Sequence, residues 1–191
     1  QNVEILCVSA LFLNDYKPFR EGNHSVFPSS ENKCRHVGNN TKRQYVRHFK
    51  VDGEVFRGSG EERCDYLLLN DEVKTSYYIE LKGSDLSKAI RQIENTIKLL
   101  SPSLPGYAVL RRIVYHTGSH NVHASEVLRW KARYKAVVKE RDIQKTFKGY
   151  PINGIRSYSK NLWSLFSAES WAVRKFLTAQ FFVAFMRIAA V

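Results

Sequence analysis

The sequence has no run of eighteen uncharged apolar residues, so it predicts no conventional membrane-spanning helix. Its three cysteines, Cys7, Cys34 and Cys64, are too few and too widely spaced for a disulfide framework or a C-x-x-C metal motif. They favour a reducing compartment, and we expect a cytoplasmic protein. No basic residue precedes the apolar stretch Val3–Leu13, so no signal peptide is expected. With only five prolines and ten glycines, the chain is neither collagen-like nor a linker.

Acidic residues are in the minority. The chain of 191 residues has 30 Lys and Arg against 18 Asp and Glu, which gives a formal charge of +12. Such an excess favours a polyanionic partner, although a solvated basic surface without a specific partner explains it as well. The basic residues flank an acidic centre at 61–95. That arrangement suits a site that binds a phosphate backbone and also holds a divalent metal.

Enough apolar residues are present, 43% with 13% aromatic, for one domain with a buried core. Residues 20–45 are polar, and Gly38-Asn39-Asn40 predicts a turn. Beyond them, periodicity predicts alternating strands and helices. The predicted strands cover 49–56 (with a turn or bulge at Asp52-Gly53), 64–69, 76–82, 107–117 and part of 136–147, and the predicted helices cover 86–100 and 125–135. The fold class is therefore α/β, a mixed central β-sheet flanked by helices.

The residues with the clearest chemistry lie on two neighbouring predicted strands. Alternate side chains of a strand share a face, so Glu80 and Lys82 point one way while Ile79 and Leu81 point the other. If the strands form a hairpin about the loop 70–75, the residue opposite Glu80 is Asp65. Opposed Cβ atoms lie roughly 5 Å apart, where two carboxylates repel unless a cation separates them.

A cation of the size of Mg²⁺, which prefers oxygen ligands, would relieve that repulsion. It would polarise a phosphoryl oxygen and lower the pKa of a bound water, while Lys82 would orient the water or neutralise charge on the phosphate. The pattern therefore predicts a phosphodiester hydrolase. The competing interpretation is a surface hairpin on which Asp65, Glu80 and Lys82 form exposed ion pairs.

Asp65, a spacer, Glu80-Leu81-Lys82 and a following amphipathic helix resemble the PD-(D/E)xK, or restriction-endonuclease-like, nuclease superfamily, over about residues 48–117. Cys64 stands where that family often has proline. The resemblance implies a restriction-endonuclease-like core. It also implies that Asp65, Glu80 and the main-chain carbonyl of Leu81 bind Mg²⁺ or Mn²⁺ and that Lys82 serves the water.

Family members often add a helix glutamine and an upstream acid. Gln92 matches the glutamine, on the flank of its helix beside Lys88, and a solvated surface glutamine is the alternative. The upstream acid stays open among Glu4, Glu31, Glu54, Glu61 and Glu62.

Several basic residues are candidates for contact with nucleic acid, of which we expect DNA to be the substrate. They are Arg63, Lys88, Arg129, Lys131 and Arg133. Trp130 and Tyr134 lie among them and either stack a base or pack a helix against the core. Three histidines, His116, His120 and His123, cluster after a predicted strand. Their spacing permits a metal or phosphate contact, but loop histidines in a basic protein more often have no such role.

The sequence predicts a nuclease domain over residues 1–160 and an apolar helical segment over 161–191 that packs on the core or on a second copy of the chain. Two other functions compete with the nuclease. One is a non-catalytic nucleic-acid-binding domain on the same fold, and the other is a protein-interaction module that acts through the apolar tail.

Overall fold

The computed structural model of the chain describes residues 13–31, 33–58, 62–82, 84–116, 120–140 and 149–154. The chain divides into two compact units, Gln1–Gly154 and Ile155–Val191, and every described residue belongs to the first. The predicted apolar helix over 161–191 and the apolar stretch over 1–12 lie outside the described residues.

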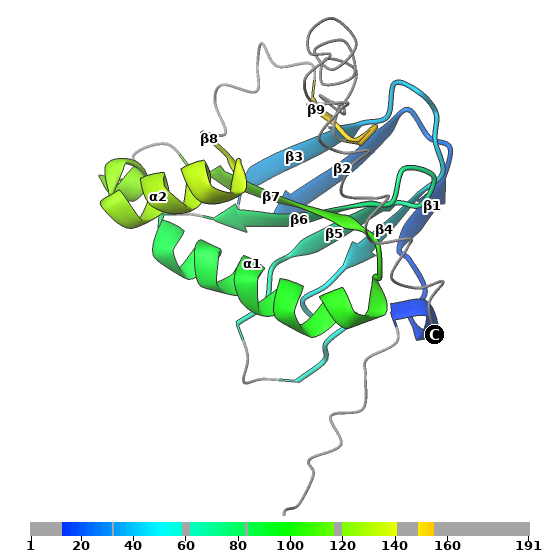
Figure 1. The fold of residues 1–191 in the computed structure, drawn as a ribbon, viewed down its shortest axis with the longest axis horizontal. Helices are drawn as coiled ribbons and strands as arrows, with labels where there is room; N and C mark the ends of the chain where they lie inside the picture. Colours follow the sequence, from blue (N-terminus) through cyan, green and yellow to red (C-terminus); the bar gives the residue numbers. More distant parts are fainter. Residues whose placement is uncertain are drawn as a thin grey trace, which may run out of the picture. The chain divides into compact units, whose positions relative to one another are not determined.

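A six-stranded mixed sheet forms the centre of the described unit (Figure 1). In spatial order its strands are β1 (Arg20–Gly22), β4 (Val46–Lys50), β5 (Tyr66–Asn70), β6 (Thr75–Lys82), β7 (Ala108–Tyr115) and β8 (Val137–Glu140). Neighbours are antiparallel from β1 to β6 and parallel from β6 to β8. The predicted mixed α/β architecture is confirmed, although the predicted strand over 49–56 is mostly a tight loop closed by a bridge between Asp52 and Phe56.

Two α-helices lie on one side of this sheet (Figure 1). Helix α1 (Leu86–Leu100) begins where expected, because the Asp85 side chain accepts the N–H of Lys88 at 2.9 Å. Helix α2 (Ser125–Tyr134) ends at Lys135, which adopts a left-handed conformation with φ of 49°. Three short 3₁₀ helices complete the helical elements of the described residues: η1 (Leu13–Asp15), η2 (Ser101–Ser103) and η3 (His120–His123). Neither α-helix is long and apolar enough to cross a membrane.

A second sheet, which the sequence did not predict, combines β2 (Val26–Glu31), β3 (Cys34–Asn39) and β9 (Tyr150–Pro151). The turn predicted at Gly38-Asn39-Asn40 is wrong in its first two residues, since Gly38 and Asn39 pair with both β2 and β9. Gly38 allows close packing instead: a Cβ there would lie 3.0 Å from Leu68 and 3.3 Å from Ile152.

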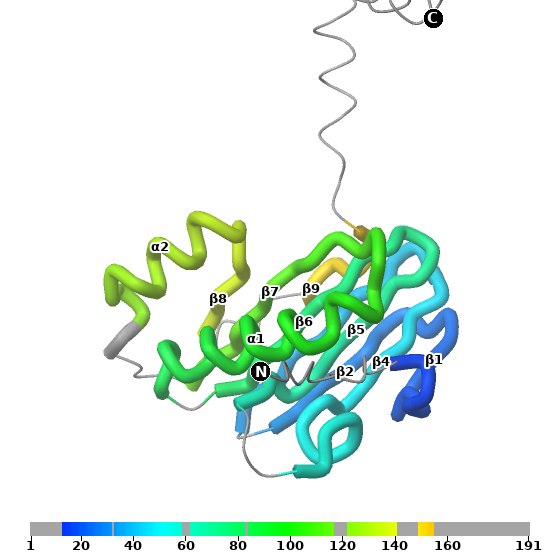
Figure 2. The backbone as a smooth tube through the Cα atoms, turned by 60° about the horizontal axis from the view of Figure 1, so that its bottom comes forward, coloured from blue at the N-terminus to red at the C-terminus, as the bar shows by residue number. Residues whose placement is uncertain are grey.

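The two faces of the six-stranded sheet bury different cores. Leu67, Leu69 and Tyr78 face α1, whereas Leu68, Tyr77 and Ile79 face the three-stranded sheet. This strict alternation is the pattern of strands buried on both faces. Figure 2 shows α1 on one side of β5 and β6 and the β2–β3 hairpin on the other. Any side chain of β6 that faces α1 is therefore covered by a helix.

Candidate functional site

The predicted pairing of the two central strands is confirmed. Tyr66 lies opposite Ile79 and Asn70 opposite Thr75, so the same register places Asp65, one residue before β5, opposite Glu80. Both side chains point toward α1 because the residues two positions along, Leu67 and Tyr78, belong to the core under that helix. The hairpin is thus buried rather than superficial.

Each carboxylate of this acid pair, Asp65 and Glu80, accepts a backbone N–H from the opposite strand segment. Asp65 Oδ2 accepts the N–H of Leu81 at 2.7 Å, and Glu80 Oε2 accepts the N–H of Asp65 at 3.2 Å. The two residues are only 6% and 1% exposed. The interpretation as exposed surface ion pairs is therefore wrong.

Burial raises the pKa of both carboxyl groups. For Glu80, desolvation is the main cause and the neighbouring Asp65 charge adds to it, while Lys82 opposes both. For Asp65, desolvation again raises the pKa and the hydrogen bond from Leu81 opposes it. A buried pair of acids that disfavours its own double ionisation has the electrostatic character of a cation site, and such perturbed groups cluster at functional sites.

Lys82 lies on the same face as Glu80, as predicted. Its Nζ is 3.5 Å from Glu80 Oε1 and donates to Gln92 Oε1 at 2.7 Å. Gln92 is only 9% exposed and its Nε2 donates to the carbonyl of Arg63 at 2.7 Å. The solvated alternative for Gln92 is therefore wrong. The side-chain amide of Gln92 thus connects Lys82 to Arg63, two residues before Asp65.

The backbone at the end of β6 is fixed from three sides. The Lys82 carbonyl accepts the N–H of His116 at 3.0 Å and the thiol of Cys34 at 3.4 Å. The Leu81 N–H points instead toward Asp65. Since a residue in an extended strand directs its N–H and C=O to the same edge, the Leu81 carbonyl faces the Asp65 side.

The candidate upstream acids lie in different surroundings. Glu31 and Asp52 both raise the pKa of Asp65 through their charges, and Asp52 was not among the sequence candidates. Glu62 pairs with Arg91 at 3.0 Å. Glu4 and Glu61 lie outside the described residues, and Glu54 is exposed on the loop after β4. Within the described ranges no group of three or more His, Cys, Asp or Glu side chains could hold a metal ion.

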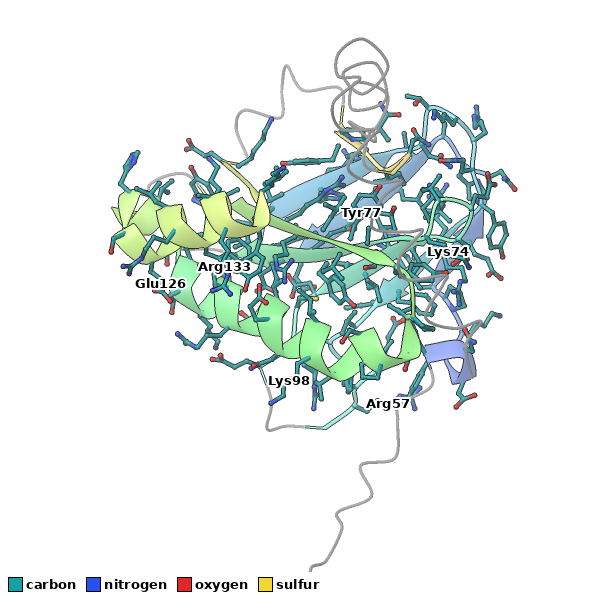
Figure 3. The ribbon with its side chains drawn as sticks, in the orientation of Figure 1. Arg57, Lys74, Tyr77, Lys98, Glu126 and Arg133 are labelled. Carbon is teal, nitrogen blue, oxygen red and sulfur yellow. The ribbon has the colours of Figure 1, made fainter. Side chains whose placement is uncertain are left out.

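The predicted nucleic-acid contacts fall into two groups. Arg63 is half-buried: its guanidinium lies over the Phe56 ring at 4.4 Å and donates to the Gly58 carbonyl at 3.0 Å. Lys88 lies in the first turn of α1, and its charge acts on Glu62 together with that of Lys82. Arg129, Lys131 and Arg133 are all exposed on α2. Figure 3 labels Arg133 and, at the other end of α2, Glu126.

The aromatic residues of α2 pack the helix rather than present a stacking surface. Trp130 is 7% exposed and its Nε1 donates to Glu94 Oε1 at 2.8 Å. The same carboxylate accepts two hydrogen bonds from Arg111, whose guanidinium lies 3.8 Å from the Tyr134 ring centroid. The packing interpretation of Trp130 therefore holds. The backbone N–H of His116 donates to the Lys82 carbonyl, and His123 is exposed on η3.

Sequence reasoning missed Thr96, which lies one helical turn after Gln92 on the same buried face of α1 and accepts the N–H of Cys64 at 2.8 Å. The four-residue spacing was the available signal. Comparison of the chain with protein-family models, with curated proteins and with solved structures returned no match.

Proposed function

We propose that the chain is a divalent-metal-dependent nuclease that hydrolyses phosphodiester bonds, with DNA as substrate, on a restriction-endonuclease-like core. The observation that carries this proposal is the meeting of four side chains at the end of β6. Asp65 and Glu80 face each other, and Lys82 bridges Glu80 to Gln92. Burying two acids side by side costs stability, and acids with pKa values perturbed in this way cluster at functional sites, which favours catalysis over an ordinary hairpin.

The donor set fits a hard divalent cation. Two carboxylates supply anionic oxygens, and the carbonyl of Leu81 faces the same side. In this proposal Asp65, Glu80 and the Leu81 carbonyl hold Mg²⁺ or Mn²⁺. When bound, the cation polarises the phosphoryl group and makes water more acidic.

The side chains of the protein perform the remaining work. Lys82, held by Gln92, donates a hydrogen bond to the scissile phosphate as negative charge develops on it, or orients the attacking water. Hydrolysis adds one water across a P–O bond, leaving a phosphate on one end and a hydroxyl on the other. The exposed basic residues of α2 and Lys88 hold the nucleic-acid backbone.

The test uses the purified full chain with plasmid DNA and a single-stranded oligonucleotide, in Mg²⁺, Mn²⁺ or chelator. We expect cleavage with metal only, and a loss of roughly 100-fold or more in Lys82→Ala, as for removal of a group that stabilises transition-state charge. Lys98→Ala, an exposed lysine near the other end of α1, is the matched control and should cut at the wild-type rate. Undiminished cleavage by Lys82→Ala, or by wild-type protein in chelator, would refute the assignment.

A second candidate is a non-catalytic nucleic-acid-binding domain, and the exposed basic residues of α2 favour it. Salt-sensitive binding without cleavage in any metal would select this function. A contact with a second copy through residues 161–191 stays a prediction, because that segment lies outside the described residues.

A further inference from the structure

One peptide group next to the acid pair is held at both of its polar ends by α1. The carbonyl of Arg63 accepts a hydrogen bond from Gln92 Nε2 at 2.7 Å, and the N–H of Cys64 donates to Thr96 Oγ1 at 2.8 Å. These two atoms belong to the same peptide unit. Since a peptide unit is planar, fixing its oxygen and its N–H fixes the orientation of the whole plane.

The orientation of this peptide plane determines the direction in which the chain continues to Asp65. The following N–H, that of Asp65, donates to Glu80, and the Asp65 side chain accepts from Leu81. A rotation of the Arg63–Cys64 peptide would therefore move both hydrogen bonds that join the two acids to the opposite strand segment. Gln92 and Thr96 therefore hold the peptide group that immediately precedes Asp65, the residue that pairs with Glu80.

The hydroxyl of Thr96 has no evident value for the helix itself. It donates to the carbonyl of Gln92 at 2.7 Å, a bond within the helix that slightly weakens helices, and threonine is a poor helix former. Thr96 is also fully buried, where an apolar side chain would avoid the cost of desolvating a hydroxyl. The second bond of this hydroxyl, the one it accepts from the N–H of Cys64, explains a threonine at this position.

We propose that Thr96 is a positioning residue, which holds Asp65 against Glu80 by fixing the Arg63–Cys64 peptide and thereby sets the affinity of the acid pair for a divalent cation. The effect on the cation rests on the proposed nuclease function, whereas the effect on the acid pair does not. Thr96 bonds the backbone of Cys64 and of Gln92 and also the Cys64 thiol, and none of these groups is a proposed metal ligand or reacting group.

The test compares Thr96→Val, which removes the hydroxyl at nearly constant shape, with Thr96→Ser, which keeps it. The matched control is Thr75→Val: Thr75 is also buried and its hydroxyl also bonds a backbone carbonyl, but it lies at the opposite end of β6. The first readout is amide hydrogen exchange at Asp65 and Leu81 in metal-free full-length protein. The second is Mn²⁺ affinity by calorimetry.

We expect Thr96→Val to speed exchange at both amides by about fivefold relative to the rest of β6, because the bonds they make open more often. We expect Mn²⁺ affinity to fall by roughly 10-fold, the lower end for loss of an outer-sphere support. Thr96→Ser should restore both values, and Thr75→Val should change neither. If Thr96→Val does not fold, Thr96→Ala removes the same hydroxyl without the β-branch.

The outcomes separate the two proposals. Wild-type protein that neither binds Mn²⁺ nor cuts DNA would overturn the nuclease function, and the exchange rates would still decide the role of Thr96. Unchanged exchange at Asp65 and Leu81 in Thr96→Val, or equal acceleration in Thr75→Val, would overturn the positioning role whatever the protein does to DNA.

Discussion

Lys82 Nζ lies closer to the neutral amide oxygen of Gln92, at 2.7 Å, than to the carboxylate oxygen of Glu80, at 3.5 Å. A lysine beside a buried acid would ordinarily be drawn fully into the ion pair. Gln92 therefore competes with Glu80 for the ammonium. The ammonium is thus shared between the two side chains, and its positive charge stays directed at the same space as the carboxylates.

The two ends of the Gln92 amide can be tested separately. Gln92→Glu keeps an acceptor for Lys82 but loses the donor to the Arg63 carbonyl, and Gln92→Leu loses both. We expect cleavage to fall by roughly 10-fold in Gln92→Glu and further in Gln92→Leu, as for the removal of supporting hydrogen bonds. Single-turnover cleavage at saturating Mn²⁺ measures this. Wild-type rates in Gln92→Leu would show that the bridge has no role.

Replacing Glu80 should stabilise the metal-free protein at high pH. Burial raises the pKa of Glu80, so the folded protein keeps a proton that the unfolded chain releases above about pH 4.3. The free energy of unfolding therefore falls as pH rises from there toward the raised pKa. Glu80→Gln, which cannot ionise, should be more stable than wild type by about 1–2 kcal/mol at pH 8 and close to wild type at pH 4.

Urea denaturation in chelator from pH 4 to pH 8 measures this difference. Glu62→Gln is the control of opposite sign, because the hydrogen bond and charge of Arg91 lower the pKa of Glu62. Its ionised form favours folding at pH above the unfolded pKa, so the variant should lose that contribution on raising the pH. A Glu80→Gln effect independent of pH would contradict the raised pKa.

Metal affinity should rise with pH. Desolvation keeps Asp65 and Glu80 partly protonated, and a cation must displace that proton to bind both carboxylates. We expect Mn²⁺ affinity to increase between pH 6 and pH 8, by up to about tenfold per pH unit for each proton released. Calorimetry in buffers of different ionisation enthalpy counts the protons. Mn²⁺ binding without proton release would contradict the partial protonation of Asp65 and Glu80 in the metal-free protein.

The basic surface of α2 should determine the salt dependence of DNA binding. Arg129 and Arg133 are both exposed on that helix. Each phosphate contact contributes about 0.9 to the slope of log affinity against log salt, so Arg129→Ala with Arg133→Ala should reduce the slope by roughly 2. Fluorescence anisotropy from 50 to 300 mM salt measures it. The control pair, Lys17→Ala with Lys42→Ala, removes two exposed charges elsewhere and should leave the slope unchanged.

A side chain at Gly38 should destabilise the packing between the two sheets. A Cβ there would approach Leu68 at 3.0 Å and Ile152 at 3.3 Å, both in the core between the two sheets. Gly38→Ala should therefore lower the free energy of unfolding by about 1–3 kcal/mol, the usual cost of overpacking. Gly58→Ala, with nothing within 4 Å of its Cβ, is the matched control. Equal stability of the two variants in urea would contradict this packing.

The register of the β5–β6 hairpin could be predicted because the two ends of its loop, Asn70 and Thr75, fix which residues of the two strands lie opposite each other. Asp65 and Glu80 are one such pair. The second sheet could not be predicted. Its strands include polar residues such as Ser29, His36 and Asn39, and one of its two pairings joins Asn39 to Pro151, far apart in the sequence. Ser29 of β2 and His48 of β4 are buried between the two sheets because they bond each other, at 3.0 Å. Local hydrophobic periodicity carries no signal for such partners.

The pairing of β3 with β9 also determines when, during translation, the core between the two sheets can be completed. Tyr150 and Ile152, which close the core over the β2–β3 hairpin, are translated about 110 residues after Asn39. On the ribosome, the core that Phe27 and Leu68 share with Tyr150 and Ile152 therefore cannot be completed until nearly the whole described unit has emerged. Throughout that interval the apolar residues of this incomplete core are a potential site of aggregation of the nascent chain.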